Sequence, residues 1–163
     1  MSWLVACADS QFLWDGWRAT PKTESTATFD DHEYRFVTTP EIWADAQLDC
    51  QSTGHHLLDL ADEAELLWVW ALADVAEPAD AWWHGYTDQA VEGTFVWDGG
   101  SSSTFTQWRT GEPNDFGSAE DCATLADNGG GAWNDKDCSQ LHPYVCESGC
   151  EKSYWYADID ADG

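Results

Sequence analysis

Residues 112–122 read Glu-Pro-Asn-Asp-Phe-Gly-Ser-Ala-Glu-Asp-Cys, and residues 133–138 read Trp-Asn-Asp-Lys-Asp-Cys. The two runs bring carboxylates, Asn amides and two cysteines into one short stretch of chain. Calcium takes roughly six to eight oxygen ligands in irregular geometry, so this mixture suits calcium better than zinc or copper. The sequence therefore predicts a calcium site here, and the same polar residues are of the kind that hold a sugar.

The composition is that of a folded, acidic chain. Of its 163 residues 43% are hydrophobic and 12 are Trp, which fits one globular domain with short extensions. Its 31 acidic residues face 6 basic ones, for a formal charge of −25. Such a charge repels nucleic acid and anionic membrane surfaces and favours cations as partners. Two plainer interpretations remain: the acidity serves only solubility, or the chain is an acidic secretory protein that buffers calcium.

The six cysteines indicate a disulfide framework and hence an oxidising compartment. The chain has no C-x-x-C pair, which argues against a zinc ribbon or a thioredoxin-like redox site, and no apolar run long enough to span a bilayer. Leu4 to Cys7 is similar to the lipobox of bacterial lipoproteins, so Cys7 is either a lipid anchor, the disulfide partner of Cys150, or a free or intermolecular thiol. We expect an extracytoplasmic protein, secreted or at the cell surface; a lipidated Cys7 would make it a bacterial lipoprotein.

Three regions differ in their residue pattern. Residues 1–28 give no firm structural signal, and the Thr- and Ser-rich stretch 20–28 is typical of a linker. Residues 29–147 carry regular patterns and form the expected domain. Residues 148–163 form an acidic tail with the D-x-D-x-D-G opening of a calcium loop, whose acids are Asp158, Asp160 and Asp162. The chain ends before a closing acid, so the tail is at best half of a calcium site, and a solvated tail is the alternative.

The domain should begin with a strand and two helices. Residues 34–37 are strand-like, and Thr39-Pro40-Glu41 then offers a cap, a first-turn proline and a first-turn acid, so the first helix should start there. Its buried face should carry Trp43, Ala46 and Cys50, and Gly54 should end it. A second helix should start at Asp62, where Glu65 completes a capping box, and end no later than Pro78.

The rest of the domain reads as short strands and irregular segments. Residues 83–86, 94–97 and 144–146 are strand-like, with Asp98-Gly99-Gly100 as a turn, whereas residues 101–132 show little regular periodicity. Helices followed by strands indicate an α+β fold. Most Trp residues should lie in the core, first among them Trp83, Trp97, Trp108 and Trp133.

A set of motifs follows one another along the chain: Trp43 and Cys50, His56-Leu57, Trp83-His84-Gly85-Tyr86, Glu112-Pro113-Asn114, Trp133-Asn134-Asp135, Cys138 and Cys146. With these motifs in this order, the chain resembles a C-type lectin-like domain over residues 29–147. Departures are mild: His84 and Tyr86 replace the usual aliphatic residues, and Gly129-Gly130-Gly131 slightly lengthens a loop. The resemblance implies two helices, small antiparallel sheets and a long irregular calcium-binding loop.

The resemblance also implies specific pairings and ligands. The disulfides would be Cys50 with Cys146 and Cys122 with Cys138. A principal calcium site would use the carbonyl oxygen of Asp135 and the side chains of Glu112, Asn114, Glu120, Asn134 and Asp135. An auxiliary calcium site would use Asp88, Glu92, Asp115 and Glu120; the alternative is that Asp88 and Glu92 are solvated turn acids.

The order Glu-Pro-Asn resembles the mannose-type members of the family, with a cis peptide bond before Pro113. Two vicinal sugar hydroxyls would complete the calcium shell, as in mannose, N-acetylglucosamine, glucose and fucose. The implied function is calcium-dependent binding of glycans or glycoproteins that bear such sugars. The alternative is a domain of the same fold in which calcium stabilises a loop for protein binding or adhesion without sugar.

Other chemistry has little support in the sequence. We interpret the histidines as structural or surface residues and predict no zinc site: His32, His55, His56, His84 and His142. There is no Gly-x-Ser-x-Gly elbow, Cys nucleophile with a nearby His, or phosphate-binding loop. Glu112 and Glu120 have the chemistry of a glycosidase pair, but calcium ligation would occupy both. We therefore expect no enzymatic activity.

Overall fold

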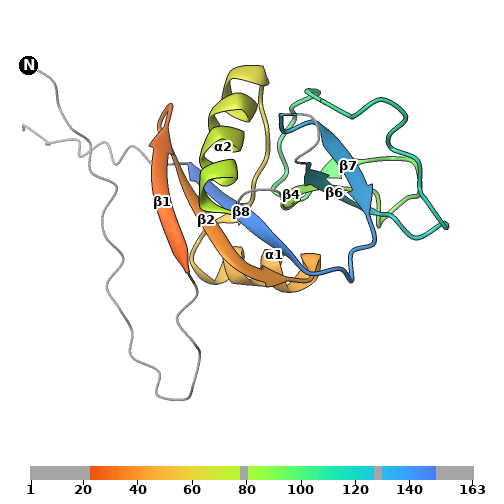
Figure 1. Cartoon of the computed structure of the whole chain (residues 1–163), viewed down its shortest axis with the longest axis horizontal. Helices are drawn as coiled ribbons and strands as arrows, with labels where there is room; N and C mark the ends of the chain where they lie inside the picture. The colour runs from red at the N-terminus through yellow and green to blue at the C-terminus, as the bar shows by residue number, and fades with distance from the viewer. Residues whose placement is uncertain (1–22, 78–80, 127–129, 150–163) are drawn as a thin grey trace, which may run out of the picture.

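The computed structural model of the chain describes residues 23–77, 81–126 and 130–149 (Figure 1). Several sequence predictions lie outside these described residues and stay predictions. They concern the lipid anchor or disulfide at Cys7 and Cys150, and the partial calcium site at Asp158, Asp160 and Asp162.

The strands of the described chain form one mixed sheet. They are β1 Glu24–Phe29, β2 His32–Glu41, β3 His56–Leu57, β4 Trp82–Thr87, β5 Val96–Trp97, β6 Cys122–Leu125, β7 Trp133–Lys136 and β8 His142–Gly149. The order is β1-β2-β8-β4-β6-β7, with β3 beside β8 and β5 beside β4. The expectation of small antiparallel sheets is therefore wrong in one respect: β4 and β8 are parallel at Trp83 and Tyr144, and this pair joins both halves into one sheet.

The first helix, α1 (Trp43–Ser52), starts later than the sequence predicts. Thr39, Pro40 and Glu41 belong to β2, and Glu41 still pairs with His142 of β8 after a register irregularity. Pairing with β8 overrides the local helix signal, and a proline without an N–H is tolerated at such an irregularity. The C-terminal prediction is confirmed: Gly54 has φ +78° and its N–H donates to the Gln51 carbonyl at 3.1 Å.

The second helix, α2 (Glu63–Ala76), starts as predicted. The Asp62 Oδ1 accepts from the Glu65 N–H at 3.0 Å, which caps the helix. Glu65 does not complete the capping box, because its Oε2 accepts from the Ala61 N–H at 2.7 Å and its Oε1 from the Tyr34 hydroxyl at 2.5 Å. In the described part of the chain, neither helix combines the length and apolarity needed to cross a bilayer.

The prediction of a linker at residues 20–28 is wrong from Glu24 on. Residues 24–29 form β1, which pairs with β2 from Glu24 opposite Val37 to Phe29 opposite His32. Thr and Ser suit an exposed edge strand as well as a linker, so composition alone could not decide between the two. The domain therefore begins before residue 29, and at its other end β8 runs past residue 147 to Gly149.

Alternation along β2 and β8 divides the interior into two cores. Phe36 opposes Val145, and both pack in a cluster with the α2 side chains Leu66, Val69 and Ala73. Val37 opposes Tyr144, and both pack in a second cluster with the α1 side chains Trp43, Ala46 and Cys50. The two helices therefore cover opposite faces of this part of the sheet (Figure 1).

The predicted tryptophan core is largely present. Trp83, Trp97 and Trp133 are buried, whereas Trp108 is half-buried and packs against the α2-side cluster. Trp82, which the sequence analysis did not single out, is fully buried as well.

Both expected disulfides are present among the described cysteines. Cys50 of α1 is joined to Cys146 of β8 across a sequence separation of 96 residues. Cys122, the first residue of β6, is joined to Cys138, two residues after β7, across a separation of 16. The second bridge closes the β6–β7 hairpin and so fixes the base of the predicted calcium site.

We predict that replacing both Cys122 and Cys138 with Ala lowers the free energy of unfolding by about 3 kcal/mol. The chain-entropy model gives this value for a closed loop of roughly 15 residues. Chemical denaturation of the double variant and the parent protein, both oxidised and without calcium, measures the difference. The control is Ser102→Ala, an exposed substitution expected to change the free energy of unfolding by no more than about 0.5 kcal/mol. Equal stability of the double variant and the parent would contradict the prediction.

Candidate functional site

The long segment 98–121 between β5 and β6 is held to the fold at a few fixed points. The Trp97 indole N–H donates to the Ser103 carbonyl at 3.1 Å. Trp133, the first residue of β7, donates its N–H to the Gln107 carbonyl at 2.7 Å and accepts from the Arg109 N–H at 2.9 Å. These two hydrogen bonds form an isolated parallel β-bridge between Trp108 and Trp133, and it brings the start of residues 109–121 beside β7.

Two of the five predicted principal ligands, Asn134 and Asp135, lie on β7. They are 4% and 0% exposed, and they pair with Thr124 and Ala123 of β6. The Asp135 Oδ2 accepts from the Asn114 N–H at 2.9 Å and from the Asp115 N–H at 2.7 Å. One carboxylate oxygen thus fastens the irregular loop to the strand beneath it.

Glu112 and Asn114 flank Pro113 in this loop, where Asn114 is exposed but the Glu112 side chain is only 7% exposed. The Glu112–Pro113 peptide bond is cis, as expected, and the Asn114 side-chain amide donates to Glu112 Oε2. The fifth residue, Glu120, returns toward the same place, since its Oε2 accepts from the Phe116 N–H at 3.0 Å and its own N–H donates to Asp115 Oδ1 at 3.2 Å. The structure therefore places the five predicted residues on one loop and on the strand beneath it, connected through the hydrogen bonds of Asp115 and Asp135.

The carboxylates of this site repel one another. Burial raises the pKa of Asp135, and the negative charge of Glu112 raises it further. Burial also raises the pKa of Glu120, to which the charges of Asp135 and Glu112 add. Each of these carboxylates is thus less stable in its charged form than it would be in water, and a bound cation would reverse that cost.

One oxygen of the site is left without a partner among the described atoms. The Asp135 Oδ1 is buried and accepts no hydrogen bond. A buried charged oxygen of this kind normally carries a hydrogen bond or a metal ion. The donors around it are carboxylate and amide oxygens, which are the ligands that calcium prefers. The residues present therefore fit a calcium ion.

The predicted auxiliary residues form an acidic group beside the first one. Asp88 is buried, its Oδ2 accepts from the Gly93 N–H at 2.8 Å, and its Oδ1 has no partner among the described atoms. Burial raises its pKa, as do the charges of Asp121 and Asp135. Lost hydration and then the charges of Asp115 and Asp88 raise the pKa of the exposed Glu92. Asp121 belongs to this acidic group and was not among the predicted residues.

Arg109 is a site residue that the sequence analysis missed. Its guanidinium donates to Glu112 Oε1 at 2.9 Å and to Asn134 Oδ1 at 3.1 Å. One guanidinium nitrogen therefore links two of the predicted calcium ligands. In the sequence, the one signal for this role was the position of Arg109 three residues before Glu112. Its contact with Asn134 depends on the β-bridge between Trp108 and Trp133, which joins distant parts of the chain.

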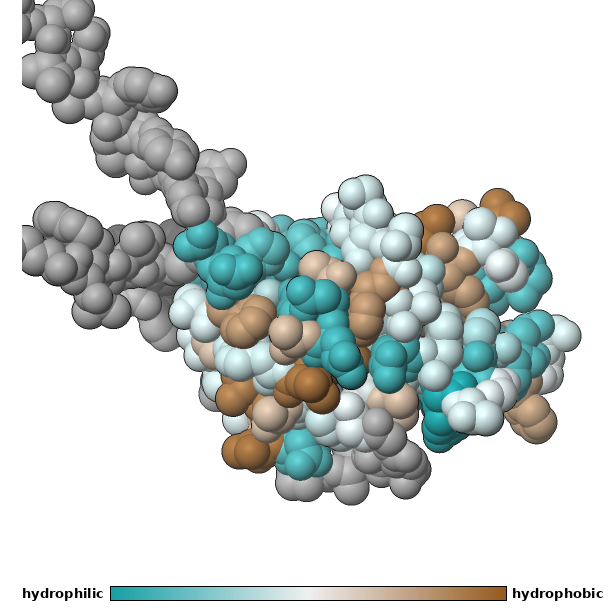
Figure 2. All heavy atoms as spheres, turned by 90° about the horizontal axis from the view of Figure 1, so that it is seen from above, coloured by the Kyte–Doolittle hydropathy of each residue, from teal (hydrophilic) through white to brown (hydrophobic). Residues whose placement is uncertain are grey.

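The surface around the site is mixed in character. Asn114 is exposed, and the neighbouring Phe116 is 79% exposed. On the face drawn in Figure 2, apolar side chains occur in separate spots among hydrophilic and neutral ones. Asn114 is therefore open to a polar ligand from solvent, and Phe116, two residues further along the chain, exposes its ring as well.

Sequence comparison relates most of the chain to one family. The family model described as "Lectin C-type domain" matches residues 39–148. An alpha-N-acetylgalactosamine-specific lectin of Patiria pectinifera is 34% identical over 141 residues, covering 80% of this chain and 83% of that protein. The C-type mannose receptor 2 of Mus musculus is 32% identical over 133 residues, covering 81% of this chain but 9% of the receptor.

Solved structures give the same relationship. The C-type lectin CEL-I from Cucumaria echinata superposes with a TM-score of 0.73 at 30% sequence identity, covering 75% of this chain and 93% of that chain. A structure described as the EPNH mutant of CEL-I superposes with a TM-score of 0.72 at 32% identity, covering 75% of this chain and 92% of that chain. This likeness, together with the two helices, the mixed sheet and the two disulfides of the described chain, confirms the predicted α+β fold class.

We predict that Asp135→Asn abolishes most of the stabilisation that calcium gives the protein. The amide oxygen can still accept from the loop N–H groups, but the buried negative charge is gone. At a calcium concentration a hundred times the Kd, the parent should gain roughly 2.7 kcal/mol, or about 5 °C or more in Tm. Thermal unfolding with and without calcium measures this gain.

Asp137→Asn is the matched control for this prediction. Asp137 lies two residues further along the chain, and its Oδ1 already accepts from the Ser139 N–H at 2.9 Å and the Ser139 hydroxyl at 2.7 Å. The calcium-dependent rise in Tm should persist in this variant. An equal rise in Asp135→Asn would show that the ion binds elsewhere.

Proposed function

The chain belongs to the C-type lectin family, and from that premise we propose that it binds mannose-type sugars through a calcium ion held by Glu112, Asn114, Glu120, Asn134 and Asp135. Proteins of this family bind carbohydrate and are not enzymes. Calcium and the choice of sugar are the parts of the proposal that need experiment.

The observation that carries the proposal is the buried, unpartnered Asp135 Oδ1 beneath the loop. The other oxygen of the same carboxylate already positions Asn114 and Asp115, so the free one is oriented by the fold rather than by solvent. A cation at this point would give the Asp135 Oδ1 a partner. It would also offset the mutual repulsion of the carboxylates of Glu112, Glu120 and Asp135.

The side chains supply the rest of a sugar site. Bound calcium would accept lone pairs from two vicinal hydroxyls. Glu112 and Glu120 would accept hydrogen bonds from these hydroxyls, while the exposed amide of Asn114 would donate a hydrogen bond to a hydroxyl oxygen. Asn134 is buried and its Oδ1 accepts a hydrogen bond from Arg109, as Glu112 Oε1 does, so each would bind calcium either through its second lone pair or by displacing the guanidinium.

The mannose preference rests on the order of the residues around Pro113. Glu112 before the proline and Asn114 after it resemble the mannose-type arrangement, whereas Gln and then Asp would resemble the galactose type. Relatives differ in this respect: one similar protein is an alpha-N-acetylgalactosamine-specific lectin and another is a C-type mannose receptor. The order in this chain therefore supports the second type.

We also propose that the protein acts outside the cytoplasm. All four described cysteines are paired, and disulfides of this kind form and persist in oxidising compartments. Millimolar calcium outside cells would keep a site of modest affinity filled, as in extracellular calcium-binding modules.

Calorimetric titration of mannose into the oxidised protein tests the proposal. We expect calcium-dependent heat with mannose that excess chelator abolishes and galactose does not reproduce. Calcium binding without heat from any monosaccharide would contradict sugar binding and favour the alternative, a calcium-stabilised loop for protein adhesion.

The double variant Glu112→Gln with Asn114→Asp tests the basis of the preference. It exchanges the acid and the amide across Pro113, so we expect its selectivity on a glycan array to move from mannose toward galactose. The control is Asp137→Asn, which changes a carboxylate outside the site and should leave selectivity unchanged. A calcium-loaded double variant with unaltered selectivity would refute the assignment of these two residues.

A further inference from the structure

His84 is a histidine in the hydrophobic interior of the domain. It lies on β4, is fully buried, and has neither ring nitrogen hydrogen-bonded to a described atom. A neutral imidazole carries one N–H donor and one acceptor nitrogen, so both are left unused here. C-type lectin-like domains usually carry an aliphatic side chain at this position, and the proposed sugar site does not use His84.

The ring of His84 packs against two tryptophans. Its centroid lies 5.7 Å from that of Trp97 on β5 and 4.7 Å from that of Trp133 on β7. Tyr86, two residues further along β4, packs on the same two tryptophans, and its hydroxyl is the other titratable group of this stack. Burial raises the pKa of Tyr86, so its hydroxyl stays neutral in acid. The surroundings of His84 are therefore aromatic and uncharged.

A positive charge on this ring is costly. Burial lowers the pKa of His84 to about 3, and the charge of no described residue adds to that effect or offsets it. Contact of the cation with the two indole rings recovers only part of the lost hydration. A protonated imidazole would also need two hydrogen-bond acceptors, and the described atoms offer its nitrogens none.

His84 lies at a point where β4 joins several parts of the domain. Trp43 of α1 donates its indole N–H to the His84 carbonyl at 3.0 Å, and the pairing of β4 with β6 is irregular around His84. Here β4 depends more on side-chain packing against Trp133 than on regular pairing with β6. The backbone of Trp133 in turn anchors the long segment 98–121. Loss of the ring packing would therefore release β4 and the loop together.

We propose that His84 is an acid-sensitive switch built into the core. Uptake of one proton by its ring favours the unfolded domain over the folded one, and it does so with or without calcium. The loop loses its anchor on β7 in the same event, so the protein would release a ligand held there. This switch goes beyond the proposed sugar binding and does not depend on it.

The direction of the pH dependence follows from the two states of the ring. In the unfolded chain the imidazole takes up a proton near its ordinary pKa of about 6.5, whereas in the folded domain the pKa of His84 is about 3. The unfolded state thus binds one more proton between these values, so the contribution of His84 to stability is lost as the pH falls below about 6.5. On account of His84, the unfolding equilibrium constant should rise about thirtyfold from about pH 7.5 to about pH 5.

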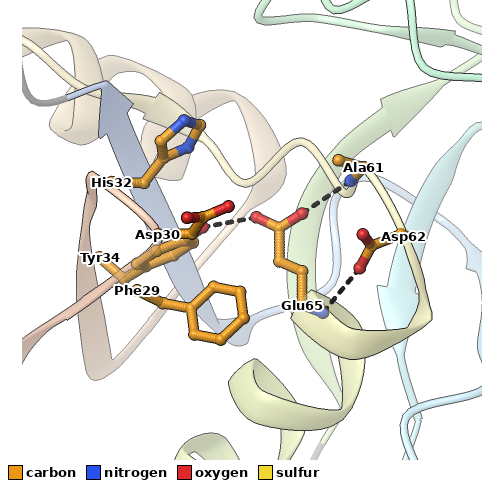
Figure 3. Close-up of a pocket in the computed structure, with 7 residues that line it drawn as sticks. All are labelled: Phe29, Asp30, His32, Tyr34, Ala61, Asp62 and Glu65. Atoms are coloured by element: carbon orange, nitrogen blue, oxygen red, sulfur yellow. Dashed lines mark hydrogen bonds between the residues drawn. The ribbon is translucent and has the colours of Figure 1, made fainter.

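Other buried groups act in the opposite direction. Burial raises the pKa of Asp59 to about 6, and it also raises the pKa of Glu65, whose carboxylate accepts hydrogen bonds from Tyr34 and Ala61 (Figure 3). These carboxyls take up protons at a higher pH in the folded domain than in the unfolded chain, so they stabilise the domain as the pH falls. The effect of His84 must therefore be measured as a difference between variants.

Urea unfolding of the full oxidised chain, with excess chelator and Trp fluorescence as the probe, measures that difference. From about pH 7.5 to about pH 5, the unfolding constant of the parent should rise about thirtyfold more than that of His84→Leu, which carries an aliphatic side chain instead. The matched control is His142→Gln, which removes a partly exposed imidazole from β8 and should keep the pH dependence of the parent. An equal rise in the parent and His84→Leu would overturn the proposal.

NMR titration of the parent is a second test that needs no substitution at position 84. The ring of His84 should stay neutral as far down in pH as the domain stays folded. A folded protein in which this ring takes up a proton near about pH 6.5 would likewise overturn the proposal. Both measurements are made without sugar, so failure of the switch and failure of sugar binding are separate results.

Discussion

The pairing of β8 with β2 on one edge and β4 on the other is the constraint on which the rest of the structure depends. β8 contacts β2 in antiparallel register, β4 in parallel, and β3 as well. Its alternating side chains divide the interior between α1 and α2, and its Cys146 is covalently fixed to α1. Once β8 is placed, β4 carries β6 and β7 beside it, and β7 holds the acidic loop at Asp135.

The features that the sequence predicted well are those set by short-range chemistry or by spaced motifs. Asp62 caps α2 because the hydrogen bond spans only three residues, and Gly54 ends α1 because few other residues adopt its φ. The five predicted residues of the principal calcium site were identifiable as a group from the resemblance, and the structure places them on one loop and on β7 beneath it.

The features that the sequence could not give depend on contacts between distant residues. Pro40 has a good helix-start pattern, yet strand pairing with β8 governs that segment. Glu65 fits a capping box, yet its carboxylate bonds to Tyr34 and Ala61. His32 is one of five scattered histidines in the sequence, and only the β2–β8 register places it against Glu147. Arg109 likewise reaches Asn134 through a single bridge between residues that are far apart in the chain.

The bridge between Trp108 and Trp133 also divides the long segment into two parts with different freedom to change. Residues before it are tied to the aromatic interior through Trp97 and Ser103, so substitutions there must respect the packing of the core. Residues 109–121 are anchored at this bridge and at Cys122, and between these points they contact the fold chiefly through polar groups. An insertion or exchange within this second part would leave the hydrophobic core intact. The length and sequence of this second part could therefore change, in evolution or by design, while the rest of the domain stays the same.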